Sequence, residues 1–505
     1  MRRLGVLLVL CVIAFHLKAT NYYVSPSGDD SNAGTSVSAS FLTLSKAVEK
    51  CTSGDDIFLL EGTYDCDARV RLKINGNAED RCSIQNYNNG KVVLDFSEME
   101  TGDSNQGILL NGNYWLIKGI TIKAAGDNGL LIDGGSNNLI EECVFTENRD
   151  TGCQLKNEAA YNSILNCDSY LNYDPSGNGE DADGFAPKLS IGEGNYFYGC
   201  RAFDNSDDGW DMYGATETVV LRNCWSFSNG YDHWDNSDFQ GDGNAFKVGG
   251  DYAAAAHFVY RCVAFFNKGK GFDQNHNMGE ITLINNTAYR NGGKDFQFYE
   301  SPDSVSDGYH TFKNNICYPK DVNFADGSLL ENNSWDLSFV SVSDNDFISL
   351  DTTGVRGVRQ SDGNLPELDF LHLSSSSEMV DAGVIDDSIF YNGNAPDIGA
   401  FETSDTSTGS ITISRNKSET AFNAKLLENP FSSELKLQIL DIDLDIKSLR
   451  VIVTSVTGRT IDTKIVNVSN SNDLITLNAE GWEAGIYLLS LFAKQSVLSF
   501  KCVKK

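Results

Sequence analysis

Basic residues are scarce in this 505-residue chain. The 39 lysines and arginines stand against 70 aspartates and glutamates, which gives a formal net charge of −31. Nucleic acids and anionic membranes are negatively charged and would be repelled by such a protein, so the charge excludes both as partners. An acidic polymer could approach this surface only where cations bridge the two.

Long apolar runs are lacking as well. The run at residues 4–15 is shorter than the about 20 residues that a membrane-spanning helix needs, and no second candidate follows it. Two arginines precede the run, and the small residue Ala19 follows it at a suitable cleavage position. We therefore expect a signal peptide at residues 1–20 and a secreted or cell-surface protein without a membrane span.

Proline is also rare, with 8 residues, whereas glycine is abundant, with 46. Short apolar runs separated by turns, without helical periodicity, indicate stacked strands. An internal repeat runs through the centre of the chain, in which an asparagine follows a cysteine by five residues. The pairs are Cys143 and Asn148, Cys167 and Asn172, Cys200 and Asn205, Cys224 and Asn229, and Cys262 and Asn267. Two of the four steps between these pairs are 24 residues, and the two longer steps of 33 and 38 residues indicate insertions.

This repeat predicts an all-β fold, a right-handed parallel β-helix whose rungs are spaced about 4.8 Å apart. The asparagines would form a ladder of amides in a turn, and the cysteines an interior stack. Removal of Cys11 with the signal peptide leaves eleven cysteines, an odd number. We interpret the five repeat cysteines as buried apolar residues rather than a disulfide framework. A disulfide among Cys51, Cys66 and Cys82 stays open.

The two ends of the expected solenoid carry further signals. Residues 41–50 have helical spacing and residues 56–64 read as a strand, which resembles the capping helix and first rung of secreted β-helices. Residues 397–402 resemble the usual close of such domains. We therefore expect a β-helix over residues 21–402 and a Ser/Thr-rich linker over residues 403–418.

The last part of the chain predicts a small β-sandwich over residues 419–505. Its segments 427–431, 451–459 and 485–490 read as strands and turns. The segment resembles the C-terminal sorting domain of the Bacteroidota secretion pathway. A small carbohydrate-binding sandwich is the alternative, but Trp482 stands nearly alone where such a domain needs an aromatic platform.

Four aspartates in the central third form the candidate site. Asp207 follows Asp183 by 24 residues, one rung if the insertion lies just before Asp183, and Asp208 and Asp211 would join them around the same turn. Four carboxylates in one small volume repel one another unless a cation compensates them, and calcium takes six to eight oxygen ligands. A calcium loop of the helical type is excluded because its terminal glutamate is absent. A structural calcium without catalysis remains the main alternative.

Three segments resemble those of polysaccharide lyase family nine, the pectate lyase group with a ten-rung parallel β-helix. They are residues 183–188, 207–211 and 241–250, and the resemblance extends over residues 21–402. It implies that the four aspartates hold calcium and that Lys247, in a Gly-Asn-x-Phe-Lys segment, is the catalytic base. One departure, an alanine at position 245 where glycine is common, implies little effect.

The implied reaction is a β-elimination, in which a base removes the C5 proton of a uronic acid and the C4 oxygen leaves. Calcium bound to the sugar carboxylate would stabilise the charge that develops. The lysine must be neutral, although its ordinary pKa is near 10.4. The calcium ion and cations such as Lys188 or Lys270 must therefore offset the aspartates. Lys188 is the alternative base.

We expect a monomeric, calcium-dependent pectate lyase that cleaves polygalacturonate. Rhamnogalacturonan I is the alternative substrate, and a non-catalytic β-helix that binds polysaccharide is the alternative class. The insertion at residues 231–240 is a candidate lining for the subsites. Trp210, Trp234 and Tyr231 are candidates for stacking on sugars, with core or loop packing as the other interpretation.

Overall fold

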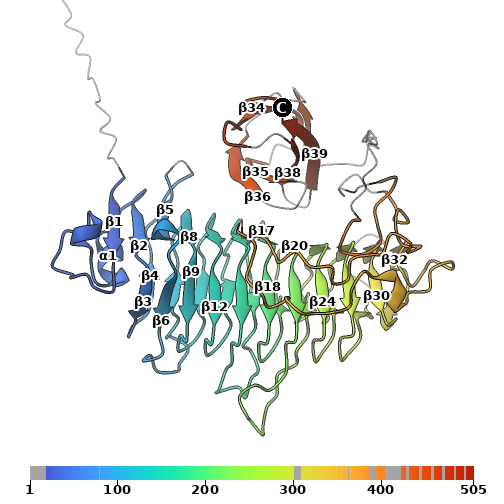
Figure 1. Cartoon of the computed structure of the whole chain (residues 1–505), viewed down its shortest axis with the longest axis horizontal. Helices are drawn as coiled ribbons and strands as arrows, with labels where there is room; N and C mark the ends of the chain where they lie inside the picture. Colours follow the sequence, from blue (N-terminus) through green and yellow to red (C-terminus); the bar gives the residue numbers. More distant parts are fainter. Residues whose placement is uncertain are drawn as a thin grey trace, which may run out of the picture.

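The fold is a right-handed β-helix followed by a small antiparallel unit, as predicted (Figure 1). The computed structural model describes residues 19–78, 80–300, 309–361, 363–385, 391, 393–403, 422–427, 431–442, 446–455, 460–468, 473–482, 485–493 and 496–504. Nearly all of the expected linker at residues 403–418 and of the expected signal peptide lies outside the described residues. The expected domain boundaries therefore stay predictions.

Three long parallel sheets, here called A, B and C, form the walls of the solenoid. Each complete rung contributes one strand to each sheet, and sheet A has one additional strand at either end. Sheet A consists of β1 (Asn21–Val24), β2 (Asp56–Leu59), β5 (Cys82–Asn86), β8 (Trp115–Lys118), β11 (Leu139–Glu141), β14 (Ser163–Leu165), β17 (Asn195–Tyr198), β20 (Val219–Arg222), β23 (Phe258–Tyr260), β26 (Thr282–Ile284), β29 (Thr311–Lys313) and β32 (Leu329–Glu331).

Sheets B and C have ten strands each. Sheet B consists of β3 (Gly62–Asp65), β6 (Val92–Asp95), β9 (Ile120–Lys123), β12 (Val144–Thr146), β15 (Asp168–Tyr170), β18 (Arg201–Phe203), β21 (Trp225–Phe227), β24 (Val263–Phe265), β27 (Thr287–Tyr289) and β30 (Ile316–Tyr318). Sheet C consists of β4 (Val70–Leu72), β7 (Ile108–Leu110), β10 (Leu130–Asp133), β13 (Cys153–Lys156), β16 (Phe185–Pro187), β19 (Trp210–Asp211), β22 (Phe246–Lys247), β25 (Phe272–Asp273), β28 (Phe296–Phe298) and β31 (Val322–Phe324).

The predicted ladders are present inside the solenoid. In the turn between sheets B and C, each asparagine amide donates to the next: Asn172 to Asn205 at 2.8 Å, and Asn205 to Asn229 at 3.0 Å. The five repeat cysteines are buried, and every cysteine that the structure describes is a free thiol. The interpretation of these cysteines as small apolar residues is therefore confirmed.

Aromatic side chains stack in the core beneath sheet C. The rings of Phe185, Trp210, Phe246, Phe272 and Phe296 follow one another at centroid distances of 4.8 to 5.0 Å. The strand register places these residues directly opposite one another, facing inward. Trp210 is fully buried, so of the two interpretations offered for it, core packing is the correct one.

A short helix closes the first rung, at the blue end in Figure 1. This helix, α1 (Leu44–Lys50), begins after Thr43, whose side chain accepts a hydrogen bond from the Lys46 backbone nitrogen at 3.1 Å. It is shorter than the helical pattern at residues 41–50 suggested, because the capped residue sets its start. Three 3-10 turns lie elsewhere: η1 (Val37–Ala39), η2 (Tyr87–Asn89) and η3 (Asp344–Asp346).

The chain beyond the last rung returns along the outer face of sheet B. Apolar side chains of this segment pack on that face, and the backbone carbonyl of Val355 accepts a hydrogen bond from Arg201 at 2.9 Å. Near its end, Ile398 and Ala400 are buried in the same cluster. The later strands of sheet B are therefore covered by this segment.

The C-terminal unit has two antiparallel sheets around one apolar core, as the predicted sandwich requires. One contains β33 (Phe422–Leu426), β34 (Glu434–Ile442) and β37 (Leu474–Asn478). The other contains β35 (Ser448–Ser455), β36 (Thr460–Asn467), β38 (Gly485–Ala493) and β39 (Ser496–Lys504). Within the described residues, no helix has the length and apolar character needed to cross a membrane.

Candidate active site

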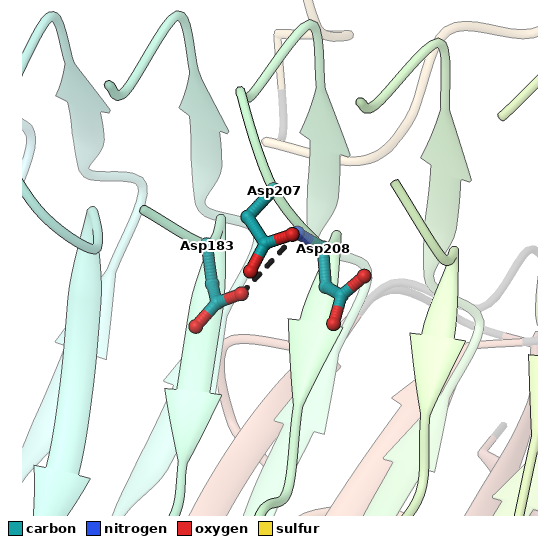
Figure 2. A group of neighbouring side chains, drawn as sticks. All are labelled: Asp183, Asp207 and Asp208. Atoms are coloured by element: carbon teal, nitrogen blue, oxygen red, sulfur yellow. Dashed lines mark hydrogen bonds between the residues drawn. The ribbon is translucent and has the colours of Figure 1, made fainter. Parts of the chain in front are cut away.

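The predicted site residues lie where the chain passes from sheet B into sheet C. Asp183 stands before β16, Asp207 and Asp208 before β19, Asp211 in β19, and Lys247 in β22. These three strands are neighbours in sheet C, so the turns bring side chains from successive rungs together. Figure 2 shows the carboxylates of Asp183, Asp207 and Asp208 gathered at adjacent rungs.

Three of the four aspartates form a compact group of oxygen donors. One carboxylate oxygen from each of Asp183, Asp207 and Asp208 lies within 4.8 Å of the other two. Asp183 and Asp208 have no exposed surface, and Asp207 is 7% exposed. Asp211 lies outside this group. It is linked to the group by ion pairs with Lys188 and Lys247. The structure therefore brings all the predicted residues to one place, with Asp211 at its side.

The register corrects one detail of the sequence analysis. Phe185 pairs with Trp210, so the rung counterpart of Asp183 is Asp208, at a step of 25 residues, and not Asp207 at 24. The reason is a difference in spacing along the chain. The stretch from the paired position in β16 to that in β17 is one residue longer than the equivalent stretch from β19 to β20, so the step between rungs is 25 residues in sheet C and 24 in sheet A. The Asp208 backbone nitrogen accordingly donates to Asp183 Oδ1 at 3.2 Å, the dashed line in Figure 2.

Backbone and amide donors hold the carboxylates in place. The Asp242 backbone nitrogen donates to Asp207 Oδ1 at 2.7 Å. Asn244 donates to Asp208 Oδ1 twice, from its backbone nitrogen at 2.6 Å and from Nδ2 at 2.9 Å. Sequence reasoning overlooked Asn244 as an orienting residue. Its position in the Gly-Asn-Ala-Phe-Lys segment, three residues before Lys247, could have identified it as a residue of the site.

Two lysines flank the aspartates and share Asp211. Lys188 Nζ lies 2.9 Å from Asp183 Oδ2 and 3.1 Å from Asp211 Oδ2. Lys247 Nζ lies 3.2 Å from Asp208 Oδ2 and 3.5 Å from Asp211 Oδ1. Both side chains are largely buried, at 10% and 15% exposed. Lys270, named as a cation that could offset the site, pairs with Asp273 at 2.7 Å instead.

Burial makes the charged form of the three central carboxylates costly. It raises the pKa of Asp183 and of Asp208 well above the ordinary value, and the neighbouring aspartates add to the rise. The pKa of Asp207 is raised to about 6, again mainly by burial. Carboxyl groups in this state take up protons unless a cation replaces them, so the cluster favours binding of a positive ion.

Asp211 and Lys247 show the opposite balance. Burial opposes ionisation of both, but the two lysines lower the pKa of Asp211, and the aspartates raise the pKa of Lys247 well above its ordinary value. Lys247 is thus held as an ammonium ion while the aspartates around it are uncompensated. Added positive charge at the carboxylates would weaken this hold.

The donor set fits a hard divalent cation. All three grouped donors are carboxylate oxygens, the ligands that calcium prefers. Asp208 Oδ2 is buried and, apart from its ion pair with Lys247, receives no hydrogen bond from any residue that the structure describes. Four carboxylates outnumber the two ammonium groups, so the site has an excess of negative charge that attracts a divalent cation.

The two predicted insertions pack against each other beside the site. The Trp234 ring stacks on Tyr173 at 4.5 Å, and the Gln240 backbone nitrogen donates to the Asn178 carbonyl at 3.0 Å. Trp234 therefore packs within the loops, whereas Tyr231 is 45% exposed. The long loops below the centre of the solenoid in Figure 1 include these segments.

Comparisons with known proteins agree with this geometry. Residues 22–315 match the family described as "Pel9A-like, right handed beta helix region", and residues 429–505 match "Secretion system C-terminal sorting domain". Pectate lyase L of Dickeya dadantii is 40% identical over 390 residues, which are 75% of this chain and 90% of the relative. Pectate lyase PEL9 of Emericella nidulans is 31% identical over 72% of this chain and 94% of the relative.

Two solved structures extend the similarity to three dimensions. The crystal structure of pectate lyase Pel9A has a TM-score of 0.73 at 39% identity, covering 77% of this chain and 98% of that one. A rhamnogalacturonan lyase has a TM-score of 0.64 at 30% identity, covering 71% and 97%. By its rungs, its sequence and its C-terminal segment, the chain belongs to the Pel9A-like right-handed β-helix family and carries a secretion sorting domain.

Proposed function

We propose that this protein is a calcium-dependent pectate lyase that cleaves the galacturonate backbone of pectin by β-elimination. The observation that carries the proposal is the group of three buried carboxylates within 4.8 Å of one another, with Lys247 Nζ 3.2 Å from Asp208. The curated relatives at 31 to 40% identity named above are pectate lyases, which supports the same activity here.

Asp183, Asp207 and Asp208 would hold the calcium ion, and Asp211 would add a fourth carboxylate beside it. Calcium, when bound, supplies the positive charge that neutralises a sugar carboxylate and makes the adjacent C5 proton more acidic. A set of oxygen donors fixed by backbone nitrogens needs little rearrangement to bind, which favours this role.

Lys247 would act as the base. Its Nζ takes the C5 proton, the electrons of that C–H bond form the C4–C5 double bond, and the C4–O bond breaks. The departing oxygen keeps the electron pair of that bond and takes a proton from water. The largely buried position of Lys247 keeps it at a fixed place in sheet C. Lys188, between Asp183 and Asp211, has two close carboxylate partners and is better suited to balancing charge than to accepting a proton.

Polygalacturonate is the proposed substrate. The rhamnogalacturonan lyase among the similar solved structures makes rhamnogalacturonan I the second candidate. The sorting domain makes this a secreted or cell-surface protein, where such polymers are met.

Replacing Lys247 tests the assignment. We expect Lys247→Ala to lower the rate of unsaturated product formation by about 10²–10⁴-fold, as loss of a general base does, while the protein still folds and binds calcium. The rate is followed by the ultraviolet absorbance of unsaturated uronates, and calcium binding by calorimetry. Lys118→Ala, on the distant β8, is the matched control and should keep full activity.

Full activity of Lys247→Ala would contradict the role of this lysine. A wild-type protein that binds calcium and polysaccharide but releases no unsaturated product from either backbone would instead be a non-catalytic β-helix.

A further inference from the structure

A row of exposed rings lies beside the candidate active site. Tyr213 is 40% exposed, Tyr252 64% and Tyr299 37%, and the His276 side chain is 39% exposed. They follow the ends of β19, β22, β25 and β28, which are four successive strands of sheet C. At about 4.8 Å a rung, the row spans roughly 14 Å along the solenoid axis.

Ring contacts join three members of the row, and Tyr213 lies against the backbone beside them. The Tyr213 ring covers Gly250, where an added Cβ would lie 2.3 Å from the ring, so a residue with a side chain there would displace it. Tyr252 and His276 have ring centroids 5.0 Å apart, and His276 and Tyr299 have centroids 5.6 Å apart. The Tyr299 hydroxyl lies 3.1 Å from His276 Nε2. Tyr252, His276 and Tyr299 thus position one another, whereas Tyr213 contacts the chain two residues before Tyr252.

The row begins at the proposed calcium site. The Tyr213 backbone nitrogen donates to Asp211 Oδ1 at 3.0 Å, the same oxygen that lies 3.5 Å from Lys247 Nζ. An occupant of the active site that extends toward the later rungs would therefore pass over these rings.

Resting on the proposed function, we propose that Tyr213, Tyr252, His276 and Tyr299 form a stacking platform for several consecutive sugar rings of the pectic chain. Sugar rings present apolar C–H faces that pack on aromatic rings, and tyrosines combine such a face with a polar tip. Two acidic side chains beside the row are paired: Asp273 with Lys270 at 2.7 Å and Glu300 with His276 at 2.9 Å. These pairs reduce repulsion of an acidic polymer at those two positions, and the direction of the row leads the polymer away from Lys247.

The test compares single variants of the full protein on polygalacturonate. We expect Tyr252→Ala and Tyr299→Ala each to raise KM about tenfold, equivalent to about 1.4 kcal/mol, with a much smaller change in kcat. The KM for trigalacturonate, too short to cover both the active site and the whole platform, should rise far less. Tyr252→Phe keeps the ring and should retain the wild-type KM.

Phe339→Ala is the matched control. Phe339 is 57% exposed and lies on the segment that packs along sheet B, away from the row, so its loss should leave KM unchanged. Unchanged KM in both tyrosine variants, or equal rises for polymer and trimer, would overturn the platform.

Polymer binding separates this idea from the catalytic proposal. Retardation of the protein in gels containing polygalacturonate needs no bond cleavage, and calcium binding by calorimetry shows whether the metal site is intact. If wild type is retarded but releases no unsaturated product, the proposed function fails while reduced retardation of the tyrosine variants still supports the platform. Equal retardation of wild type and variants, or none of the wild type, would overturn it.

Discussion

Two sets of buried polar side chains lie next to each other in this solenoid and behave in opposite ways. Asn205 belongs to the asparagine ladder, and Asp208, three residues later, belongs to the carboxylate cluster. Each ladder amide both donates and accepts, so Asn205 accepts from Asn172 and donates to Asn229. A carboxylate only accepts, and its neighbours repel it. The ladder satisfies its own hydrogen bonds, whereas the cluster carries excess negative charge that a cation would offset.

The largest expected effect comes from removing one charge from the cluster. Asp208→Asn should reduce calcium affinity at least about a hundredfold, since even indirect partners of a metal cost 10–100-fold when lost. Activity should fall with affinity and recover in part when calcium is added. In chelator, this variant should melt at or above the temperature of wild type, because the substitution relieves repulsion. Calorimetric titration and thermal melts measure both effects. A calcium affinity equal to that of wild type would show that Asp208 is not a ligand.

A smaller effect is expected from the same kind of change in the ladder. In Asn205→Ala, the backbone nitrogen and Nδ2 of Asn172 lose their acceptor, and Asn229 Oδ1 loses a donor. The loss of these buried hydrogen bonds should lower the free energy of unfolding by about 2–4 kcal/mol. Denaturant unfolding measures this loss. Calcium should stabilise this variant by the same increment as wild type. A calcium increment that disappears in Asn205→Ala would mean that ladder and cluster are not independent.

The regular part of the molecule could be predicted from the sequence because repetition makes it visible. The step from Cys200 to Cys224 gave the rung, and the asparagine that follows each gave the ladder. The position of Lys247 beside the aspartates followed from a segment resembling a known family. The rung and the ladder depend on residue type and spacing alone, whereas the position of Lys247 was implied by the family resemblance.

Other features depend on turn lengths, which the repeat does not reveal. Asp183 is paired with Asp208 and not Asp207 because one turn is a residue longer, a difference hidden by the 24-residue spacing. Trp210 lies in the core because its position in β19 faces inward, although its type suits sugar binding equally well. The rings of the row, Tyr213 to Tyr299, follow four strands at different distances from the strand ends. The number of residues between successive rings therefore varies, and no repeat reveals the row.

Calcium dependence of product formation tests the central claim most directly. The rate of unsaturated uronate release from polygalacturonate is followed by ultraviolet absorbance before and after addition of a chelator, and again after calcium in excess. The account predicts that activity disappears with the chelator and returns with calcium, because the buried carboxylates keep Lys247 protonated until a cation compensates them. A rate that is unchanged in the chelator would contradict it.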